Sequence, residues 1–354
     1  MMLQVLGVRS RFWPLLLLLL LLLLGGCSDP VPDLAADSLA DLAAVAPEVS
    51  VSGLSSGAYM AVQYHVAFSE AVVGVGAVAG GPYYCSQGSL WRALTRCLTT
   101  GVSPSVAASV ATTRRAAREG SIDALAGLAG DRVYLYGGLA DGTVSPAVVA
   151  ALEGYYRALG LGGQLRVVRP LGAGHNFPTL NTGVPCGASR PPFLGDCGRD
   201  GAGQILMHIY GDLAPRVAEP QGEWVAFDQR AFFDPDRTDP GLHATGYLYV
   251  PPGCREGRER CRLHIAFHGC RQSVDSQSGE AFIRRAGYNH WADNNRLIIL
   301  YPQVATTRPW WLGGRNPRGC WDWWGYSDDD FHLQSGAQLA VVRRMVRGIV
   351  ENGR

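Results

Sequence analysis

The chain has 354 residues, 47% of them hydrophobic, and its 31 basic and 30 acidic side chains leave a formal net charge of +1. This near balance argues against nucleic acid or an anionic membrane surface as the main partner. The length and the apolar content suit a large α/β enzyme that buries a sizeable core.

The N-terminal segment has the pattern of an export signal. Arg9 and Arg11 precede ten consecutive leucines at 15–24, a run too short to span a bilayer as a mature helix. The small residues before Cys27 resemble the lipobox of bacterial lipoproteins, in which that cysteine is lipidated. An ordinary cleaved signal with an incidental cysteine is the alternative. We therefore predict a lipoprotein-type signal peptide at 1–26.

The remaining chain is expected to divide into a tether and one domain. Residues 27–46 are rich in Ala, Asp and Pro and suit a tether after the lipidated cysteine. Residues 47–354 are predicted to form a single catalytic domain, with no separate substrate-binding domain. Ser28 after the cysteine resembles the outer-membrane sorting pattern. We expect an exported protein, either a periplasmic or cell-surface lipoprotein of the outer membrane or a secreted protein.

The other eight cysteines indicate disulfides, which fits an oxidising compartment. Six of them fall in close pairs, and two remain for each other. The expected disulfides are Cys85–Cys97, Cys186–Cys197, Cys254–Cys261 and Cys270–Cys320. Zinc is the competing hypothesis, but the spacing lacks the C-x-x-C pattern of such sites.

The sequence G-L-S-S-G at 53–57 has the form of a nucleophile elbow. The alternating residues 47–52 before it predict a strand, and residues 58–68 after it predict a helix. A sharp turn between strand and helix lifts the hydroxyl of Ser55 above the sheet edge, and glycines on either side allow the close approach. Ser55 is therefore the candidate nucleophile.

Strands and helices then alternate, which predicts a mostly parallel sheet with helices on both faces. We expect strands at 71–79, 132–137 and 165–169 and helices at 105–118 and 146–158. Asp141 follows the second of these strands, and His175 follows the third. Serine, acid and histidine in this chain order indicate an α/β-hydrolase triad. His332 is the alternative base.

An α/β hydrolase also needs strands before the elbow strand, and here they come late in the chain. The segment around 263–272 contains His268-Gly269-Cys270 and follows a strand at 246–251, which we expect to be its hairpin partner. A helix near 279–294, a strand at 297–302 and a helix at 335–351 complete the series. We therefore predict a circularly permuted α/β hydrolase.

Several motifs together resemble the single-domain, circularly permuted poly(3-hydroxybutyrate) depolymerases of the fungal type. They are G-L-S-S-G-A-Y-M at 53–60, A-G-G-P-Y-Y-C at 79–85, G-H-N-F-P-T at 174–179, G-Y-L-Y-V-P at 246–251, H-G-C-R-Q at 268–272, I-L-Y-P-Q at 299–303 and G-C-W-D-W at 319–323. The resemblance implies a serine esterase that hydrolyses short-chain polyhydroxyalkanoates or their oligomers. It assigns Ser55 as nucleophile, Asp141 as acid and His175 as base.

The resemblance also implies the surroundings of the triad. The backbone amides of Ser56 and Cys270 would form the oxyanion hole. Trp323 matches a tryptophan that contacts polymer in such enzymes, and we add Trp321 and Tyr59 as candidate substrate-binding residues. We expect no metal and no cofactor, a monomer, and contact with membrane only through the lipid anchor.

Two other functions remain open at this point. The same scaffold would suit a feruloyl or acetyl-xylan esterase, because acyl specificity depends on pocket shape rather than on the triad. A surface lipoprotein that binds polymer without cleaving it is the second alternative.

Overall fold

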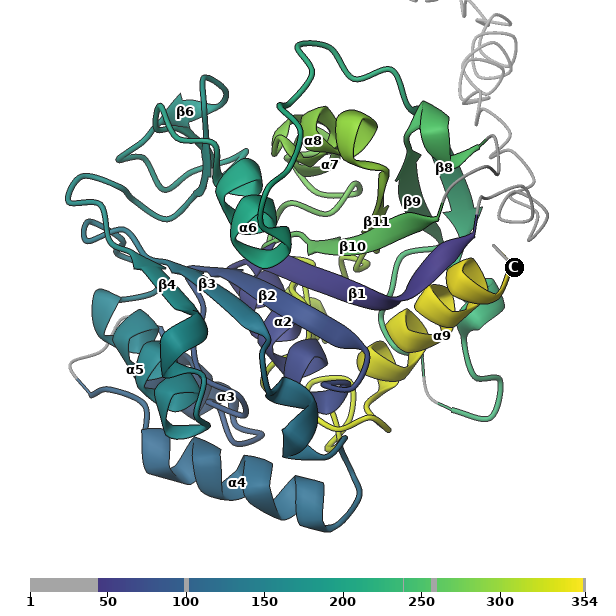
Figure 1. Ribbon diagram of the computed structural model, residues 1–354. Helices are drawn as coiled ribbons and strands as arrows, with labels where there is room; N and C mark the ends of the chain where they lie inside the picture. Colours follow the sequence, from purple (N-terminus) through teal and green to yellow (C-terminus); the bar gives the residue numbers. More distant parts are fainter. Residues whose placement is uncertain (1–43, 99–101, 238, 256–259, 353–354) are drawn as a thin grey trace, which may run out of the picture. The chain divides into compact units, whose positions relative to one another are not determined.

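The part of the chain that the structure describes is built around an eight-stranded sheet (Figure 1). This computed structural model describes residues 44–98, 102–237, 239–255 and 260–352. In spatial order the strands are β4 (Leu165–Val168), β3 (Arg132–Tyr136), β2 (Val72–Val78), β1 (Val45–Leu54), β10 (Cys261–Phe267), β11 (Leu297–Tyr301), β9 (Thr245–Val250) and β8 (Glu223–Asp228). The strands from β4 to β11 in this order are parallel, and β9 is antiparallel to both β11 and β8.

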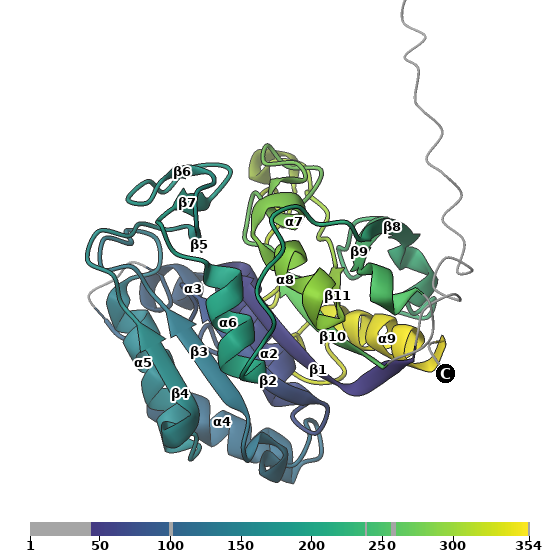
Figure 2. The ribbon, with the colours of Figure 1, turned by 45° about the horizontal axis from the view of Figure 1, so that its top comes forward.

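Helices cover both faces of this sheet (Figure 1). They are α2 (Ser56–Ala67), α3 (Leu90–Arg96), α4 (Val106–Arg118), α5 (Pro146–Ala158), α6 (Gly201–Tyr210), α7 (Ala281–Arg285), α8 (Tyr288–Asn295) and α9 (Ala337–Asn352). Short 3-10 helices lie at Leu125–Leu128, Gly162–Gln164, Gln229–Phe232, Pro252–Cys254 and Trp310–Leu312. A small second sheet contains β5 (Phe177–Thr179), β7 (Leu194–Asp196) and β6 (Val184–Pro185) and stands apart from the main sheet in Figure 2. The predicted fold class, an α/β fold with a mostly parallel sheet and helices on both faces, is confirmed.

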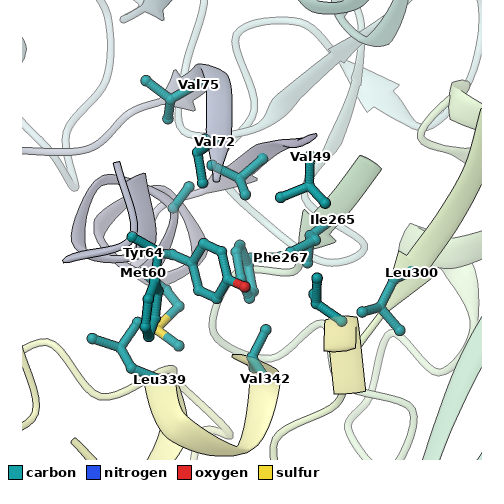
Figure 3. Packing of buried hydrophobic residues seen from close by; sticks show 14 of the residues in the cluster. Val49, Met60, Tyr64, Val72, Val75, Ile265, Phe267, Leu300, Leu339 and Val342 are labelled. Carbon is teal, nitrogen blue, oxygen red and sulfur yellow. The ribbon is translucent and has the colours of Figure 1, made fainter. Parts of the chain in front are cut away.

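The sheet separates two hydrophobic clusters, because successive side chains of a strand point to opposite faces. On β3, Val133 and Leu135 belong to the cluster that also contains residues of α2, α4, α5 and α9, whereas Tyr134 and Tyr136 belong to the cluster with residues of α6, α7 and α8. Figure 3 shows Phe267 of β10 beside Tyr64 of α2 in the first cluster, with α9 close by. Burying each such side chain contributes about 2 kcal/mol, so the two clusters hold the sheet rigidly beneath its loops.

The domain boundary differs slightly from the prediction. The predicted signal peptide, Cys27 and most of the tether lie outside the described residues. β1 already begins at Val45, and the carbonyl oxygen of Ala44 accepts a hydrogen bond from the backbone N–H of Cys261. The last two residues of the predicted tether at 27–46 therefore belong to the central sheet.

Two predicted elements were wrong in detail. The strand at 246–251 does not pair with β10, because β10 already has β1 and β11 as parallel neighbours; β9 instead forms a hairpin with β8. The helix expected near 279–294 is divided into α7 and α8 at Gly287, whose φ of 102° is incompatible with a continuous helix. α3, α6, β8 and the small sheet were not predicted.

Candidate active site

A pocket of about 250 Å³ opens where the parallel strands end. In open α/β sheets, ligands bind in the crevice at the carboxyl ends of the strands. Its lining comes from the loops after β1, β3, β4 and β10, from α3, and from the segment at 316–324. The lining residues are Leu54, Ser55, Leu90, Ala93, Leu94, Leu98, Thr143, His175, Ser189, Phe193, Gly269, Cys270, Arg271, Asn316, Pro317, Arg318, Cys320, Trp323 and Trp324.

Ser55 occupies the sharp turn between β1 and α2. Its backbone lies at φ 56° and ψ −121°, a conformation that residues with a side chain rarely adopt, and its N–H donates to the carbonyl oxygen of Val78 (2.9 Å). Strain of this kind concentrates at functional sites. The turn puts Ser55 in the pocket lining, with 8% of its surface exposed.

The two glycines of the elbow are required by close backbone approach. A Cβ at Gly53 would lie 2.3 Å from the carbonyl oxygen of Gly57, and a Cβ at Gly57 would lie 2.3 Å from that of Phe267. No side chain fits at such distances. The strand, the helix and β10 can therefore meet beneath Ser55 only with glycine at both positions.

Asp141 is fixed in the loop after β3 by its own backbone neighbours. Its Oδ1 accepts hydrogen bonds from the N–H groups of Thr143 (2.7 Å) and Val144 (2.9 Å). Its Oδ2 lies 2.8 Å from Nδ1 of His175. The carboxylate is buried and has one oxygen committed to the loop and the other to the imidazole, which fixes the ring orientation.

The loop that bears His175 is fastened to the small sheet. The N–H of His175 donates to Oγ of Ser189 (2.8 Å), and the side-chain amide of Asn176 donates to the carbonyl oxygens of Cys186 (2.7 Å) and Ala188 (3.0 Å). The Cys186–Cys197 disulfide closes that segment. The structure therefore brings Ser55 and His175 to one pocket, with Asp141 behind the histidine.

The loop after β10 forms the facing wall. The N–H of Gly269 donates to Oε1 of Gln272 (2.7 Å), and Nε2 of Gln272 donates to the carbonyl oxygen of Pro192 (2.8 Å). His268 lies beneath this loop, its Nδ1 2.8 Å from the carbonyl oxygen of Gly269, and burial lowers its pKa to about 4. A neutral His268 thus supports the backbone next to Cys270.

Aromatic side chains complete this wall, but of the three predicted substrate-binding residues, Trp323, Trp321 and Tyr59, only Trp323 lines the pocket. Trp323 lines the pocket and stacks on Tyr59, with ring centroids 4.2 Å apart. Tyr59 is itself buried and outside the lining, so it supports Trp323 from behind. Trp321 has 0% of its surface exposed and packs against Phe267 and His268. The prediction that Trp321 contacts substrate is therefore wrong, because its indole is part of the core.

Asp322 holds the backbone of this aromatic segment. Its Oδ1 accepts from the N–H groups of Trp324, Gly325 and Tyr326, and its Oδ2 accepts from the N–H and hydroxyl of Ser327. Burial raises the pKa of Asp322, and the hydrogen bonds from Ser327 and the following amides oppose that rise. The carboxylate thus fixes the backbone that bears Trp323 and Trp324, the two residues after it.

A second serine–histidine cluster lies inside the sheet. The ring nitrogens of His264 lie 2.6 Å from Oγ of Ser50 and 2.7 Å from Oγ of Ser52. Burial lowers the pKa of His264 to about 3, and none of the three residues lines the pocket. Among the described hydrogen bonds, no carboxylate joins this cluster. It serves as a neutral link between β1 and β10.

The alternative base, His332, also lies outside the pocket. Its ring stacks on Tyr84 at 3.9 Å, and burial lowers its pKa to about 4. The four disulfides found within the described residues join the pairs 85–97, 186–197, 254–261 and 270–320, which are the pairs named in the sequence analysis. The last one links the Gly269–Cys270 wall to the aromatic segment.

Comparison with known proteins gives the family. The chain is 39% identical over 312 residues to a polyhydroxybutyrate depolymerase of Talaromyces funiculosus, a match that covers 85% of this chain and 89% of that protein. The chain belongs to the polyhydroxybutyrate depolymerase family. It is also 37% identical over 303 residues to a poly(3-hydroxybutyrate) depolymerase of Delftia acidovorans, and the match covers 84% of this chain but only 59% of that longer protein. No family model matches the chain.

Solved structures of the family agree with this fold. The crystal structure of a PHB depolymerase from Penicillium funiculosum matches with a TM-score of 0.79 at 36% identity, over 88% of this chain and 98% of that one. A PHB depolymerase complexed with an R3HB trimer, in a serine-to-alanine variant, matches equally well. The four disulfides indicate an oxidising, extracellular or secreted location. Within the described residues, no helix could cross a membrane and no group of side chains has the composition of a metal site.

The apolar part of the pocket lining at α3 was not predicted from the sequence. Leu90 and Leu94 of α3 line the pocket from inside the loop closed by the Cys85–Cys97 disulfide, and Leu98 lines it just after that loop. The i, i+4 spacing of leucines between those cysteines was the available signal. Phe193, Ser189, Arg271 and Arg318 also line the pocket, and only the folded chain brings these distant loop residues together.

Proposed function

We propose that the protein is a serine esterase that hydrolyses poly(3-hydroxybutyrate), or its oligomers, through an acyl-enzyme. The observation that carries this proposal is the 2.8 Å contact between Asp141 and His175 in the same pocket as the strained Ser55, in a chain of the polyhydroxybutyrate depolymerase family. A solved relative that is complexed with an R3HB trimer supports the same substrate class.

In this mechanism Ser55 is the nucleophile and His175 the general base. With Nδ1 of His175 donating to Asp141, the lone pair of Nε2 is available to take the hydroxyl proton of Ser55 as its oxygen attacks the ester carbonyl. The proton then passes to the departing alcohol. Water next attacks the acyl-enzyme with the same base, and Asp141 stabilises the imidazolium each time.

Two backbone amides would stabilise the oxyanion. Ser56 is the first residue of α2, so its N–H has no acceptor within the helix. Cys270 lines the same pocket as Ser55. Preorganised donors of this kind contribute about 3 kcal/mol each to the stability of the transition state.

The pocket wall suits an apolar polyester chain. Leu90 and Leu94 are 38% and 50% exposed at its rim, and Trp323 lies deeper. Such a surface binds the methyl-bearing backbone of a short-chain hydroxyalkanoate without needing charged groups in the substrate. Trp323 is the residue that we assign to this contact.

The topology also supports a circular permutation. β1, which leads to Ser55, is the first strand along the described chain, yet it lies in the middle of the sheet. Its neighbour β10 and the next strand, β11, come from the last third of the chain. They occupy the place where strands preceding an elbow strand are expected. The loop after β10 then supplies Cys270 to the site.

We also propose, from the sequence alone, that the protein is exported with a lipid on Cys27. The small residues before this cysteine and the preceding leucine run support the proposal. Intact-mass measurement of the protein from its native membranes, with a Cys27→Ser variant as control, decides between an acylated and an unmodified N-terminus.

The function is tested by assaying purified protein side by side on amorphous poly(3-hydroxybutyrate), a hydroxybutyrate trimer and methyl ferulate. We expect acid release from the first two at rates well above that from methyl ferulate, and none in Ser55→Ala. Preference for methyl ferulate would favour the carbohydrate-directed esterase. Adsorption to polymer without acid release would favour the binding lipoprotein, and hydrolysis by Ser55→Ala would overturn the mechanism.

A further inference from the structure

Two arginines line the active-site pocket without a role in the mechanism above. Arg271 directly follows Cys270, and Arg318 lies two residues before Cys320. Both residues are exposed to solvent. Among the residues that the structure describes, neither guanidinium has a hydrogen-bond acceptor or a carboxylate partner. Unpaired arginines in a substrate pocket are available to bind an anion.

The protein holds these two arginines together. The backbone N–H of Arg271 donates to the carbonyl oxygen of Arg318 (2.7 Å), and the Cys270–Cys320 disulfide joins the neighbouring residues. The pKa of Arg318 is lowered by burial and by the positive charge of Arg271. The two charged groups are thus close enough to repel each other, and an anion between them would relieve that repulsion.

Asp275, four residues after Arg271, does not pair with either arginine. Asp275 accepts hydrogen bonds from the hydroxyl of Ser273 (2.7 Å) and from the N–H (2.9 Å) and hydroxyl (3.0 Å) of Thr306. Its oxygens are therefore committed to local loop contacts. The positive charge of Arg271 and Arg318 remains available on this side of the pocket.

The backbone of Arg271 adds an independent indication. Its φ is 63°, in the left-handed region that favours glycine. A long side chain at such a position is disfavoured by the backbone. The arginine is therefore better explained by a function of its guanidinium than by the needs of the turn.

The pocket consequently has two chemically different sides. Leu90 and Leu94 of α3, with Leu98 just after it, provide apolar lining, whereas Arg271 and Arg318 provide cationic lining, which also includes the buried Asn316. Ser55 and Cys270 lie in the same lining. A substrate that is apolar along its length and anionic at one end matches this division.

We propose that Arg271 and Arg318 bind the free carboxylate at the end of a hydroxyalkanoate chain. The proposal rests on the proposed ester hydrolysis and specifies how the chain is oriented. In such a polyester each cleaved bond joins the acyl carbonyl of one unit to the alcohol oxygen of the next, so the terminal carboxylate always belongs to the alcohol fragment. The arginines therefore hold the leaving fragment.

The chemical step then has a defined direction. Attack by Ser55 forms its ester with the acyl fragment and breaks the bond to the alcohol oxygen, which takes the proton from His175. The alcohol fragment carries the carboxylate away from the arginines as it leaves. Oligomers with a free carboxylate are therefore favoured over their neutral esters, whereas bonds in the interior of a polymer chain are not affected by the arginine pair.

The test compares the R271Q/R318Q variant with the wild type on three substrates: the hydroxybutyrate trimer as free acid, the same trimer as methyl ester, and amorphous polymer. We expect the KM of the wild type for the free acid to be about tenfold lower than for the methyl ester, as charge-assisted hydrogen bonds to a carboxylate provide. The variant should lose this difference and keep its rates on the methyl ester and the polymer. Raising the salt concentration should reduce the difference in the wild type.

The control variant is R308Q/R315Q, which removes two positive charges from exposed arginines that do not line the active-site pocket. It should keep the preference for the free acid. Equal KM values for acid and methyl ester in the wild type, or an equal loss on both in R271Q/R318Q, would overturn the proposal.

A binding experiment separates this proposal from the proposed function. Calorimetric titration of the Ser55→Ala variant with the trimer acid and with its methyl ester does not depend on hydrolysis. Tighter binding of the acid, lost when the R271Q/R318Q substitutions are combined with Ser55→Ala, supports the arginine site. This holds even if the wild type hydrolyses neither trimer. Equal affinities contradict the site even if hydrolysis is rapid.

Discussion

The two sides of the pocket are held in place by different means. On one side, Asp141 and His175 lie on loops after neighbouring strands and are fixed by hydrogen bonds within and between those loops. On the other side, Cys270 and Trp323 come from segments far apart along the chain, fixed by a disulfide and by the buried Asp322. The first side carries the acid–base chemistry, and the second carries the proposed oxyanion and substrate contacts.

This difference has a physical consequence. Hydrogen bonds inside short loops form as soon as the parallel strands pair, so the geometry of Asp141 and His175 follows from the sheet. The Cys270 wall depends on a contact across a sequence separation of 50 residues, which the disulfide maintains. Changes on the first side should therefore affect kcat alone, and changes on the second should affect activity together with stability or KM.

The largest effect is expected from Asp141→Asn. The amide keeps the shape of the side chain but cannot stabilise the imidazolium and favours the wrong tautomer of His175. We expect kcat to fall by about 10⁴, with an unchanged KM. Steady-state kinetics on the trimer ester measure kcat and KM, and thermal unfolding checks that the variant is folded. A loss below tenfold would show that Asp141 is not the acid partner of the base.

The second-largest effect is expected from removing the Cys270–Cys320 disulfide. In C270A/C320A the amide of residue 270 is no longer held in position, so we expect kcat/KM to fall by about a hundredfold, close to the value of one oxyanion donor. The loop length predicts a loss of about 4 kcal/mol in unfolding free energy. The control C254A/C261A removes a disulfide that closes a loop of only 7 residues and does not line the pocket. It should lose about 2 kcal/mol and keep kcat/KM. Equal kcat/KM values in the two variants would contradict this account of the wall.

Acid should weaken the same side through His268. Its Nε2 accepts the N–H of Val304 (3.2 Å), so protonation would break that contact. Burial lowers its pKa to about 4, although the charge of Asp275 acts in the opposite direction. Because the unfolded chain binds this proton near its ordinary pKa of about 6.5, the contribution of His268 is complete above that pH and is lost as the pH falls toward 4. It amounts to about 3 kcal/mol.

Urea unfolding between pH 7 and pH 4 checks this expectation. Burial also lowers the pKa of His264 and His332, so part of the pH dependence belongs to them and has the same sign. The variant His268→Gln should therefore show a smaller decrease in unfolding free energy over this range than the wild type. If His268→Gln and the wild type showed the same pH dependence of the unfolding free energy, His268 would not be a source of the acid sensitivity.

The smallest effect concerns substrate contact. Trp323→Ala should raise KM for the trimer about tenfold and change kcat less than threefold, because the indole contacts the chain rather than the reacting atoms. Trp311 is the matched control, since its side chain is 82% exposed and does not line the pocket. Trp311→Ala should leave both constants for the soluble trimer unchanged. A large drop in kcat for Trp323→Ala would show that the indole affects the reacting atoms, which contradicts this assignment.

The sequence predicts the first side of the pocket far better than the second. Ser55 stands in a local strand–turn–helix pattern, and Asp141 and His175 follow strands whose apolar runs are visible in the chain. The two nearby tryptophans, however, have different surroundings. Trp321 packs against Phe267 in the core, whereas Trp323 stacks on Tyr59 and lines the pocket. No local pattern contains this information.

The missed elements have similar causes. α3 has only 7 residues, too few for a clear helical period in the sequence. Such a short helix is not stable by its own propensity, and the Cys85–Cys97 disulfide helps to hold it in place. The pairing of β9 with β8 and β11 rather than with β10 depends on which strands β10 has already taken as neighbours. Arg271 and Arg318 are brought together by the disulfide and by one backbone hydrogen bond.

The most direct test of the central claim is to locate the nucleophile chemically. A fluorophosphonate probe forms a covalent bond to the oxygen of an activated serine and releases fluoride. Digestion and fragmentation mass spectrometry should place one label per chain on Ser55, with no labelling of Ser55→Ala and slower labelling of Asp141→Asn. A label on Ser50, Ser52 or another serine, or undiminished labelling of Ser55→Ala, would contradict the account.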